Sequence, residues 1–75
     1  MVMNEKDVND RIKLFYNTKT YTHIQNVFER FYNGYIISIE SNHIIFQDDE
    51  LGNIPIIITE ITKIDYSLKN KNPNK

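Results

Sequence analysis

Isoleucine-rich stretches separated by short polar groups dominate the second half of this 75-residue chain. Between residues 30 and 66, β-branched and aromatic side chains alternate with polar groups at residues 41–42 and 48–53. Side chains of the first kind favour strands, and short polar groups between them favour turns. The pattern predicts an antiparallel sheet built from the four strands 30–40, 43–47, 54–59 and 61–66.

The first half of the chain begins with a different periodicity. Val8, Ile12 and Phe15 are spaced four and three residues apart, which places them on one face of a helix. Asn4 is suited to cap the start of this helix, and Asp7 follows three residues later. We therefore predict one amphipathic helix of about three turns, with an apolar stripe that must pack against the sheet.

A polar break at residues 17–20 ends this helix, and weaker alternation over residues 21–27 predicts a first strand. The next feature is Asn33-Gly34, a dipeptide that ordinarily forms a hairpin turn. Strand-forming residues flank it on both sides, however, and a glycine inside a strand often marks a sharp bend. We interpret Gly34 as a bend within one long strand, so that the sheet has five strands.

Length and composition predict a single domain over residues 1–66 and a disordered polar tail over residues 67–75. A chain this short buries little surface and usually needs additional stabilisation. It contains no cysteine, and its two histidines, His23 and His43, are too scattered for a zinc site. We therefore expect no metal or other cofactor, and we expect self-association to supply the additional stability.

The net charge of −1 differs from the strongly basic character of most nucleic-acid-binding domains. No apolar stretch approaches the roughly 20 residues that span a bilayer. The first ten residues lack the basic and apolar segments of a signal peptide. These features predict a cytoplasmic protein without a membrane partner.

Few residues suggest catalysis or metal binding. The adjacent carboxylates Asp48, Asp49 and Glu50 differ from a calcium loop, which spaces its ligands at alternate positions, and we interpret them as a hairpin tip. His43 has no evident nucleophile or orienting carboxylate beside it. No phosphate-binding loop or nucleophile motif is present. We expect that the protein is not an enzyme.

Two segments of the chain carry a resemblance to a known family. FYNGYIISIE consists of an apolar strand, Gly34, a second apolar stretch and the acidic Glu40, and IIITEITKI places Ile61 and Ile64 as apolar anchors. In this order the segments resemble the two motifs of the Sm-like superfamily, which includes Sm, Lsm and Hfq proteins. The resemblance covers about residues 4–66. It implies a mainly β fold, in which an N-terminal helix precedes a five-stranded, strongly bent antiparallel small barrel.

The same resemblance implies function. It suggests a non-catalytic module that forms a homo-oligomeric ring through its edge strands and associates with single-stranded RNA. The expected RNA contacts are the polar turn between the second and third strands together with nearby basic and aromatic side chains. These candidate residues are Arg30, Tyr32, Ser41, Asn42 and His43.

An alternative stays open, because the chain lacks the usual RNA-contacting motifs of the family. The Met-Asn and Arg-Gly pairs of eukaryotic and archaeal members are absent, and Ile57-Ile58-Thr59 occupies the place of the Tyr-Lys-His of Hfq. Together with the slight negative charge, this favours an SH3-like or Sm-like barrel that acts in protein interaction or assembly without nucleic acid. The identity of a protein partner is not predicted.

Overall fold

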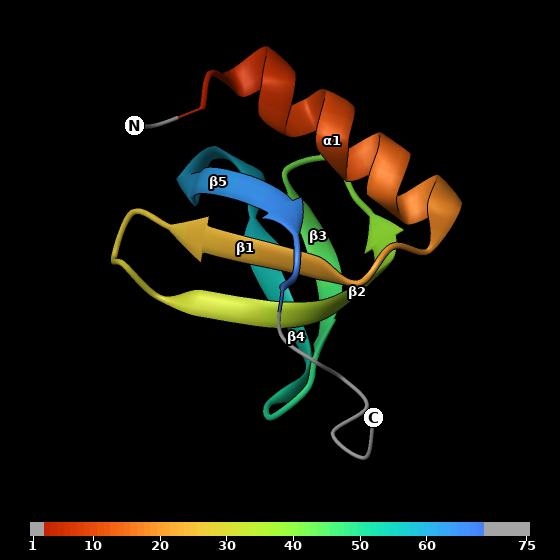
Figure 1. The fold of residues 1–75 in the computed structure, drawn as a ribbon. Helices are drawn as coiled ribbons and strands as arrows, with labels where there is room; N and C mark the ends of the chain where they lie inside the picture. The colour runs from red at the N-terminus through yellow and green to blue at the C-terminus, as the bar shows by residue number, and fades with distance from the viewer. Residues whose placement is uncertain (1–2, 69–75) are drawn as a thin grey trace.

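The computed structural model describes residues 3–68, so that most of the predicted disordered tail, residues 69–75, lies outside this range. One helix, α1 (Glu5–Thr18), precedes a single antiparallel sheet (Figure 1). The strands are β1 (Thr22–Asn26), β2 (Phe31–Ile39), β3 (His43–Asp48), β4 (Gly52–Ile57) and β5 (Ile61–Tyr66). A short 3-10 turn, η1 (Ile58–Glu60), joins β4 to β5. The predicted mainly β class, with one N-terminal helix and five antiparallel strands, is confirmed.

The sheet has the order β4-β3-β2-β1-β5, which makes β4 and β5 its two edges. It is strongly curled, and in Figure 1 β3 and β4 cross the direction of β1, β2 and β5. Because the edge strands do not pair with each other, the curled sheet is not closed into a complete barrel. Each edge therefore has one side without a neighbouring strand.

Helix α1 forms as the sequence predicts. The side chain of Asn4 accepts a hydrogen bond from the Asp7 amide at 2.8 Å, which caps the first turn. Val8, Ile12 and Phe15 are all buried, so the predicted stripe faces the sheet. The side chains that they meet come from all five strands: Ile24, Ile36, Ile44, Phe46, Ile56, Ile61 and Ile64.

The placement of Gly34 inside a long strand, rather than in a hairpin turn, is also confirmed. Gly34 lies within β2, opposite Thr22 on β1 and Asp48 on β3. A further irregularity between Ile36 and Ser38 shifts the register against β3. A β-bulge of this kind bends a strand and increases its twist, so β2 is bent near Ile36–Ser38.

The fourth strand differs from its prediction. Residues 54–59 were expected to be extended, but β4 begins at Gly52 and ends at Ile57, after which the chain turns. Gly52 has a φ of 77°, a left-handed conformation that glycine adopts readily. It ends the hairpin turn, so that β4 begins two residues before its predicted start at residue 54. Ile57, the last residue of β4, is 42% exposed in the single chain. Exposure of this side chain leaves apolar surface at the β4 edge.

The last described residues remain attached to the sheet. The Ser67 amide donates to the Tyr21 carbonyl at 2.9 Å, so the ladder between β1 and β5 extends one residue into the stretch that was predicted to be disordered. Within residues 3–68, no helix has the length and apolar character required to cross a membrane.

Candidate functional site

Three of the five predicted RNA-contacting residues lie around one hollow. Tyr32, Asn42 and His43 line a space of about 470 Å³ at one end of the sheet. Arg30 and Ser41 are exposed but are not among the residues that line it. The remaining walls come from the end of β1, from β4 and from η1: Asn26, Pro55, Ile56, Ile57 and Glu60. We call this space the turn hollow.

Backbone hydrogen bonds hold the two connections beside the turn hollow together. Ser41 and Asn42 form the turn between β2 and β3, which the Glu40 amide closes by donating to the His43 carbonyl at 2.8 Å. The Ile58 amide donates to the Asn42 carbonyl at 3.0 Å, so η1 is attached to the same turn. The Asn42 side-chain oxygen lies 2.8 Å from Nδ1 of His43. The tertiary structure thus unites segments that are separate in the sequence.

Asn26 is a residue that sequence reasoning missed. It is buried, and its side-chain oxygen accepts hydrogen bonds from the amides of Phe28 (2.9 Å) and Arg30 (3.0 Å). These bonds hold the turn between β1 and β2, in which Glu29 has a positive φ of 60°. Asparagine commonly bonds to the backbone two residues ahead, so its position before a turn was the signal that could have identified it.

The charge around the turn hollow is negative. Residues 31–62 contain neither lysine nor arginine. Of their five carboxylates, three form the hairpin tip at the opposite end of β3 from His43, and two lie nearer the hollow. Glu60 lines the hollow itself, and Glu40 precedes the turn. Because phosphate backbones are bound mainly by lysine and arginine, this surface offers little electrostatic attraction to nucleic acid beyond Arg30 at its margin.

The acidic hairpin tip has a structural role for one of its carboxylates. Asp48 is buried, and its side chain accepts hydrogen bonds from the amides of Asn33 (3.1 Å), Glu50 (2.9 Å) and Leu51 (3.0 Å). These bonds stabilise the loop as the hairpin interpretation expects. Within residues 3–68, no three acidic or histidine side chains are grouped so that they could hold a metal ion.

The neighbouring carboxylate of Asp49 accepts a hydrogen bond from the Tyr21 hydroxyl. Burial of the phenol, reinforced by this bond and by the negative charge of Asp49, raises the pKa of Tyr21 to about 12. The Tyr21 ring also packs against that of Tyr35, tilted by 45° to it, with ring centroids 5.4 Å apart. These contacts tie the start of β1 to the tip of the β3–β4 hairpin.

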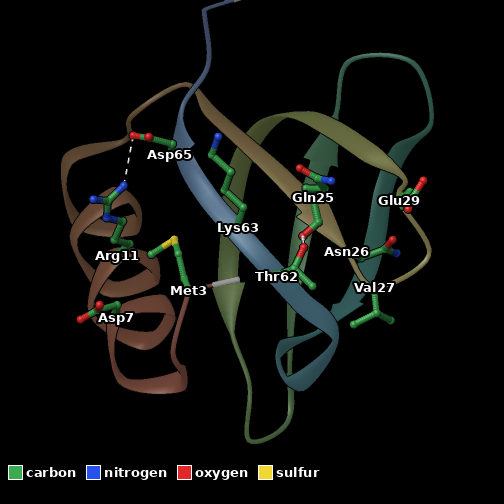
Figure 2. A pocket seen from close by; sticks show the side chains of 10 residues that line it. All are labelled: Met3, Asp7, Arg11, Gln25, Asn26, Val27, Glu29, Thr62, Lys63 and Asp65. Carbon is green, nitrogen blue, oxygen red and sulfur yellow. Dashed lines mark hydrogen bonds and ion pairs between the residues drawn. The ribbon is translucent and has the colours of Figure 1, made fainter. Parts of the chain in front are cut away.

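A second hollow, of about 670 Å³, extends from α1 across β5 to the end of β1 and the turn that follows it (Figure 2). Arg11 reaches from α1 to β5, where its guanidinium lies 3.1 Å from the Asp65 carboxylate and donates to the Ile64 carbonyl at 3.1 Å. Met3 lies between the helix and β5, and its amide donates to the Thr62 carbonyl at 2.9 Å. The sequence showed no sign of these contacts, because Met3 precedes every periodic segment.

Several large apolar side chains remain on the surface. Phe28 and Phe31, beside the turn between β1 and β2, are 67% and 58% exposed. The Phe31 ring stacks on that of His23 with centroids 5.6 Å apart. Contiguous exposed apolar groups are a feature of many interaction surfaces.

A scan against models of protein families finds no match for this chain, and a search of curated protein sequences finds none either.

Proposed function

We propose that this protein is a non-catalytic, Sm-like module that self-associates head to tail through its two sheet edges and forms a closed oligomer. The observation that carries this proposal is the difference between those edges. β4 pairs only with β3, and its outer side faces no other strand. Strand edges of this kind readily add a further strand. The glycine-centred bend of β2, which the Sm-like resemblance requires, supports the same proposal.

The distribution of charge favours pairing between unlike edges. Of the nine lysines and arginines, three lie beyond residue 68, and the remaining six lie outside residues 31–62. One of these six, Lys63, lies within β5 beside Asp65, whereas the β3–β4 hairpin carries carboxylates and neither lysine nor arginine. Pairing of β4 with β5 of a second copy brings these opposite charges together. Pairing of β4 with another β4 opposes carboxylates, which is unfavourable.

Pro55 provides a second argument against pairing of like edges. The backbone N–H and C=O groups of successive residues in a strand point alternately to its two sides. The Ile58 amide points toward β3. The backbone groups of Asn53, Pro55 and Ile57 therefore point away from β3, toward the open side of β4. Proline has no N–H to donate. A two-fold contact centred on Pro55 would lack both of its central donors. Heterologous contacts of unlike surfaces close into rings when the rotation between copies allows it.

Light scattering coupled to size-exclusion chromatography tests self-association. We expect a mass that rises with concentration to one discrete species, with a hexamer or heptamer as the outcome that agrees with the Sm-like resemblance. A chain that stays monomeric at about 1 millimolar contradicts the proposal. A dissociation constant of about 1 millimolar corresponds to an association free energy of only about 4 kcal/mol.

Single-stranded RNA is a second candidate ligand, because Tyr32, Asn42 and His43 share the turn hollow. An aromatic ring and polar groups on a turn are the side chains that read unpaired bases. The deficit of basic groups there favours the alternative, assembly without nucleic acid. Fluorescence anisotropy with U-rich and A-rich RNA at physiological salt distinguishes the two. The RNA proposal requires binding below about 50 micromolar, within the range of weak non-specific complexes.

A paired substitution locates any RNA that binds. Asn42→Ala weakens binding if the turn hollow is the site, whereas Gln47→Ala changes an exposed residue of β3 that does not line the hollow and leaves binding unchanged. Equal binding by both variants places the RNA elsewhere and removes the basis for this candidate site.

A further inference from the structure

The outer side of β5 is not open in the single chain. The Ser67 amide points toward β1. Because backbone groups alternate along a strand, those of Lys63 and Asp65 also point toward β1. The backbone groups on the outer side of β5 are therefore those of Thr62, Ile64 and Tyr66. These outward groups are the ones that a strand from a second copy would need. Most of them already have partners within the chain.

Two residues outside the sheet supply three of those partners. The Met3 amide donates to the Thr62 carbonyl at 2.9 Å, and the Met3 sulfur lies 3.5 Å from the Ile64 nitrogen, at the limit of a weak hydrogen bond. The Arg11 guanidinium donates to the Ile64 carbonyl at 3.1 Å. The Asp65 carboxylate, which pairs with Arg11, accepts from the Tyr66 amide at 2.8 Å. Figure 2 shows Met3 and Arg11 along this side of β5.

We propose that Met3 and Arg11 form a removable cap on the β5 edge, which must leave before β4 of a second copy can pair there. This inference rests on the proposed self-association and adds its regulation. The two edges of the sheet are then unequal in a second way, since β4 is ready to pair whereas β5 becomes available only when the cap opens. Assembly is thereby limited at low concentration.

The cap is weak enough to be displaced. Its Arg11–Asp65 pair is solvent-accessible, with each side chain 42% exposed, and such pairs contribute little. A thioether is a poor acceptor, so Ile64 gains little from Met3. A strand that pairs along β5 offers the outward N–H and C=O groups regular partners instead. The apparent dissociation constant of the assembly equals its intrinsic value divided by the uncapped fraction.

Substitutions of Met3 test the effect of the cap on assembly without disturbing the rest of the fold. Met3→Pro removes the N–H that reaches Thr62, and the residue precedes the helix cap Asn4, where proline leaves α1 intact. Met3→Leu retains the N–H and the apolar side chain and serves as the matched control. We expect the midpoint concentration for assembly of the full-length chain to fall about tenfold in Met3→Pro, and to stay near that of the wild type in Met3→Leu.

A second substitution tests the helix side of the cap. Arg11→Gln weakens the contacts to Ile64 and Asp65 and should likewise promote assembly, whereas Lys13→Gln changes an exposed charge on the same helix and should not. Sedimentation equilibrium over a range of concentrations gives the midpoints. Because Lys13→Gln removes the same unit of charge, it controls for the change in net charge.

The possible outcomes are distinct for the cap and for self-association. If the wild type assembles and Met3→Pro has the same or a higher midpoint, the cap is wrong while self-association stands. If no form of the chain associates at about 1 millimolar, self-association is wrong and the cap loses its role. The methyl NMR signal of Met3 adds an independent readout, since it should move to its unpacked position as the wild type assembles.

Discussion

Gly34 on β2 lies against the backbone carbonyl of Gln47 on β3, so closely that a Cβ placed on Gly34 would stand 1.8 Å from that oxygen. No side chain larger than hydrogen fits between the two strands at this point. The close approach explains why Asn33-Gly34 lies inside a strand rather than in a hairpin turn, because the glycine is required for space between strands and not for a positive φ.

Replacement of Gly34 by alanine should therefore destabilise the protein severely. The atoms that the new methyl group meets belong to the backbone of β3, which cannot rotate away as a side chain would. We expect a loss of about 3 kcal/mol or more in the free energy of unfolding, at the upper end of overpacking effects. Urea denaturation followed by circular dichroism measures this loss.

Gly52→Ala is the matched control for that substitution. Gly52 has a positive φ of 77°, but a Cβ there meets no atom within 4 Å. The expected cost is about 1 to 2 kcal/mol, from the left-handed backbone alone. A smaller loss for Gly34→Ala than for Gly52→Ala would contradict the steric explanation.

Within the acidic tip, stability should depend strongly on Asp48 and little on Glu50. Asp48→Ala leaves the amides of Asn33, Glu50 and Leu51 without their acceptor. Hydrogen bonds to charged acceptors contribute about 1.5–3 kcal/mol, so we expect a loss of about 2 to 3 kcal/mol. Glu50→Ala, at an exposed position of the same tip, should change stability by less than about 0.5 kcal/mol. Equal losses in the two variants would refute the assigned role of Asp48.

Tyr21 should make stability fall in alkaline solution. Burial and the bond to Asp49 raise the pKa of Tyr21 from 10.0 to about 12, so the fold favours the neutral phenol. Its contribution is fully present below pH 10 and is lost as the pH rises through about 12. Absorbance titration of tyrosinate should show one of the five tyrosines ionising later than the others. The late step should be missing from Tyr21→Phe.

A simpler titration would argue against this assignment. If all tyrosines ionise together near pH 10 while circular dichroism still shows a folded chain, the Tyr21 hydroxyl is not held as described. Asp49→Asn gives an intermediate test, since it removes a negative charge but leaves the burial of the ring, and it should lower the pKa of Tyr21 without restoring its ordinary value.

Self-association through unlike edges should depend on salt and on Ile57. Raising the ionic strength from about 0.05 to 0.5 M shortens the reach of charge interactions and should weaken assembly. Ile57→Lys removes exposed apolar surface from β4 and adds a positive charge, so it should raise the midpoint concentration further. Leu14→Lys changes a residue of α1 that is 51% exposed and is the matched control. If both lysine variants assemble like the wild type, β4 is not the contact.

Local patterns in the sequence were sufficient for most of the fold. The spacing of Val8, Ile12 and Phe15 identified the buried side of α1, and the bounds of β5 agree with the prediction. The end of β4 could not be read in this way, because Ile57 and Ile58 have the same side chain but lie in a strand and in a turn. Their difference arises from the hydrogen bond between the Ile58 amide and Asn42, which is a tertiary contact.

The candidate site was only partly accessible to sequence reasoning. Asn42 and His43 are adjacent in the chain, so their proximity follows from the turn. Tyr32 lies at the opposite end of β2 from that turn, and it joins them only because the sheet is curled. Arg30 was included for its charge, but the turn that Asn26 holds leaves it outside the lining of the hollow. A charge in the sequence indicates a type of partner, not the direction in which its side chain points.

The helix and strands of this protein follow from local sequence, because periodic apolar side chains and turn-forming residues act over a few neighbouring positions. Which strand edge is available depends instead on contacts between distant parts of the chain. Met3 reaches Thr62, and Arg11 reaches Ile64, across more than fifty residues of chain. Backbone N–H and C=O groups are common to nearly all residues, so no pattern of side chains could reveal that those of β5 are engaged while those on the outer side of β4 face no strand.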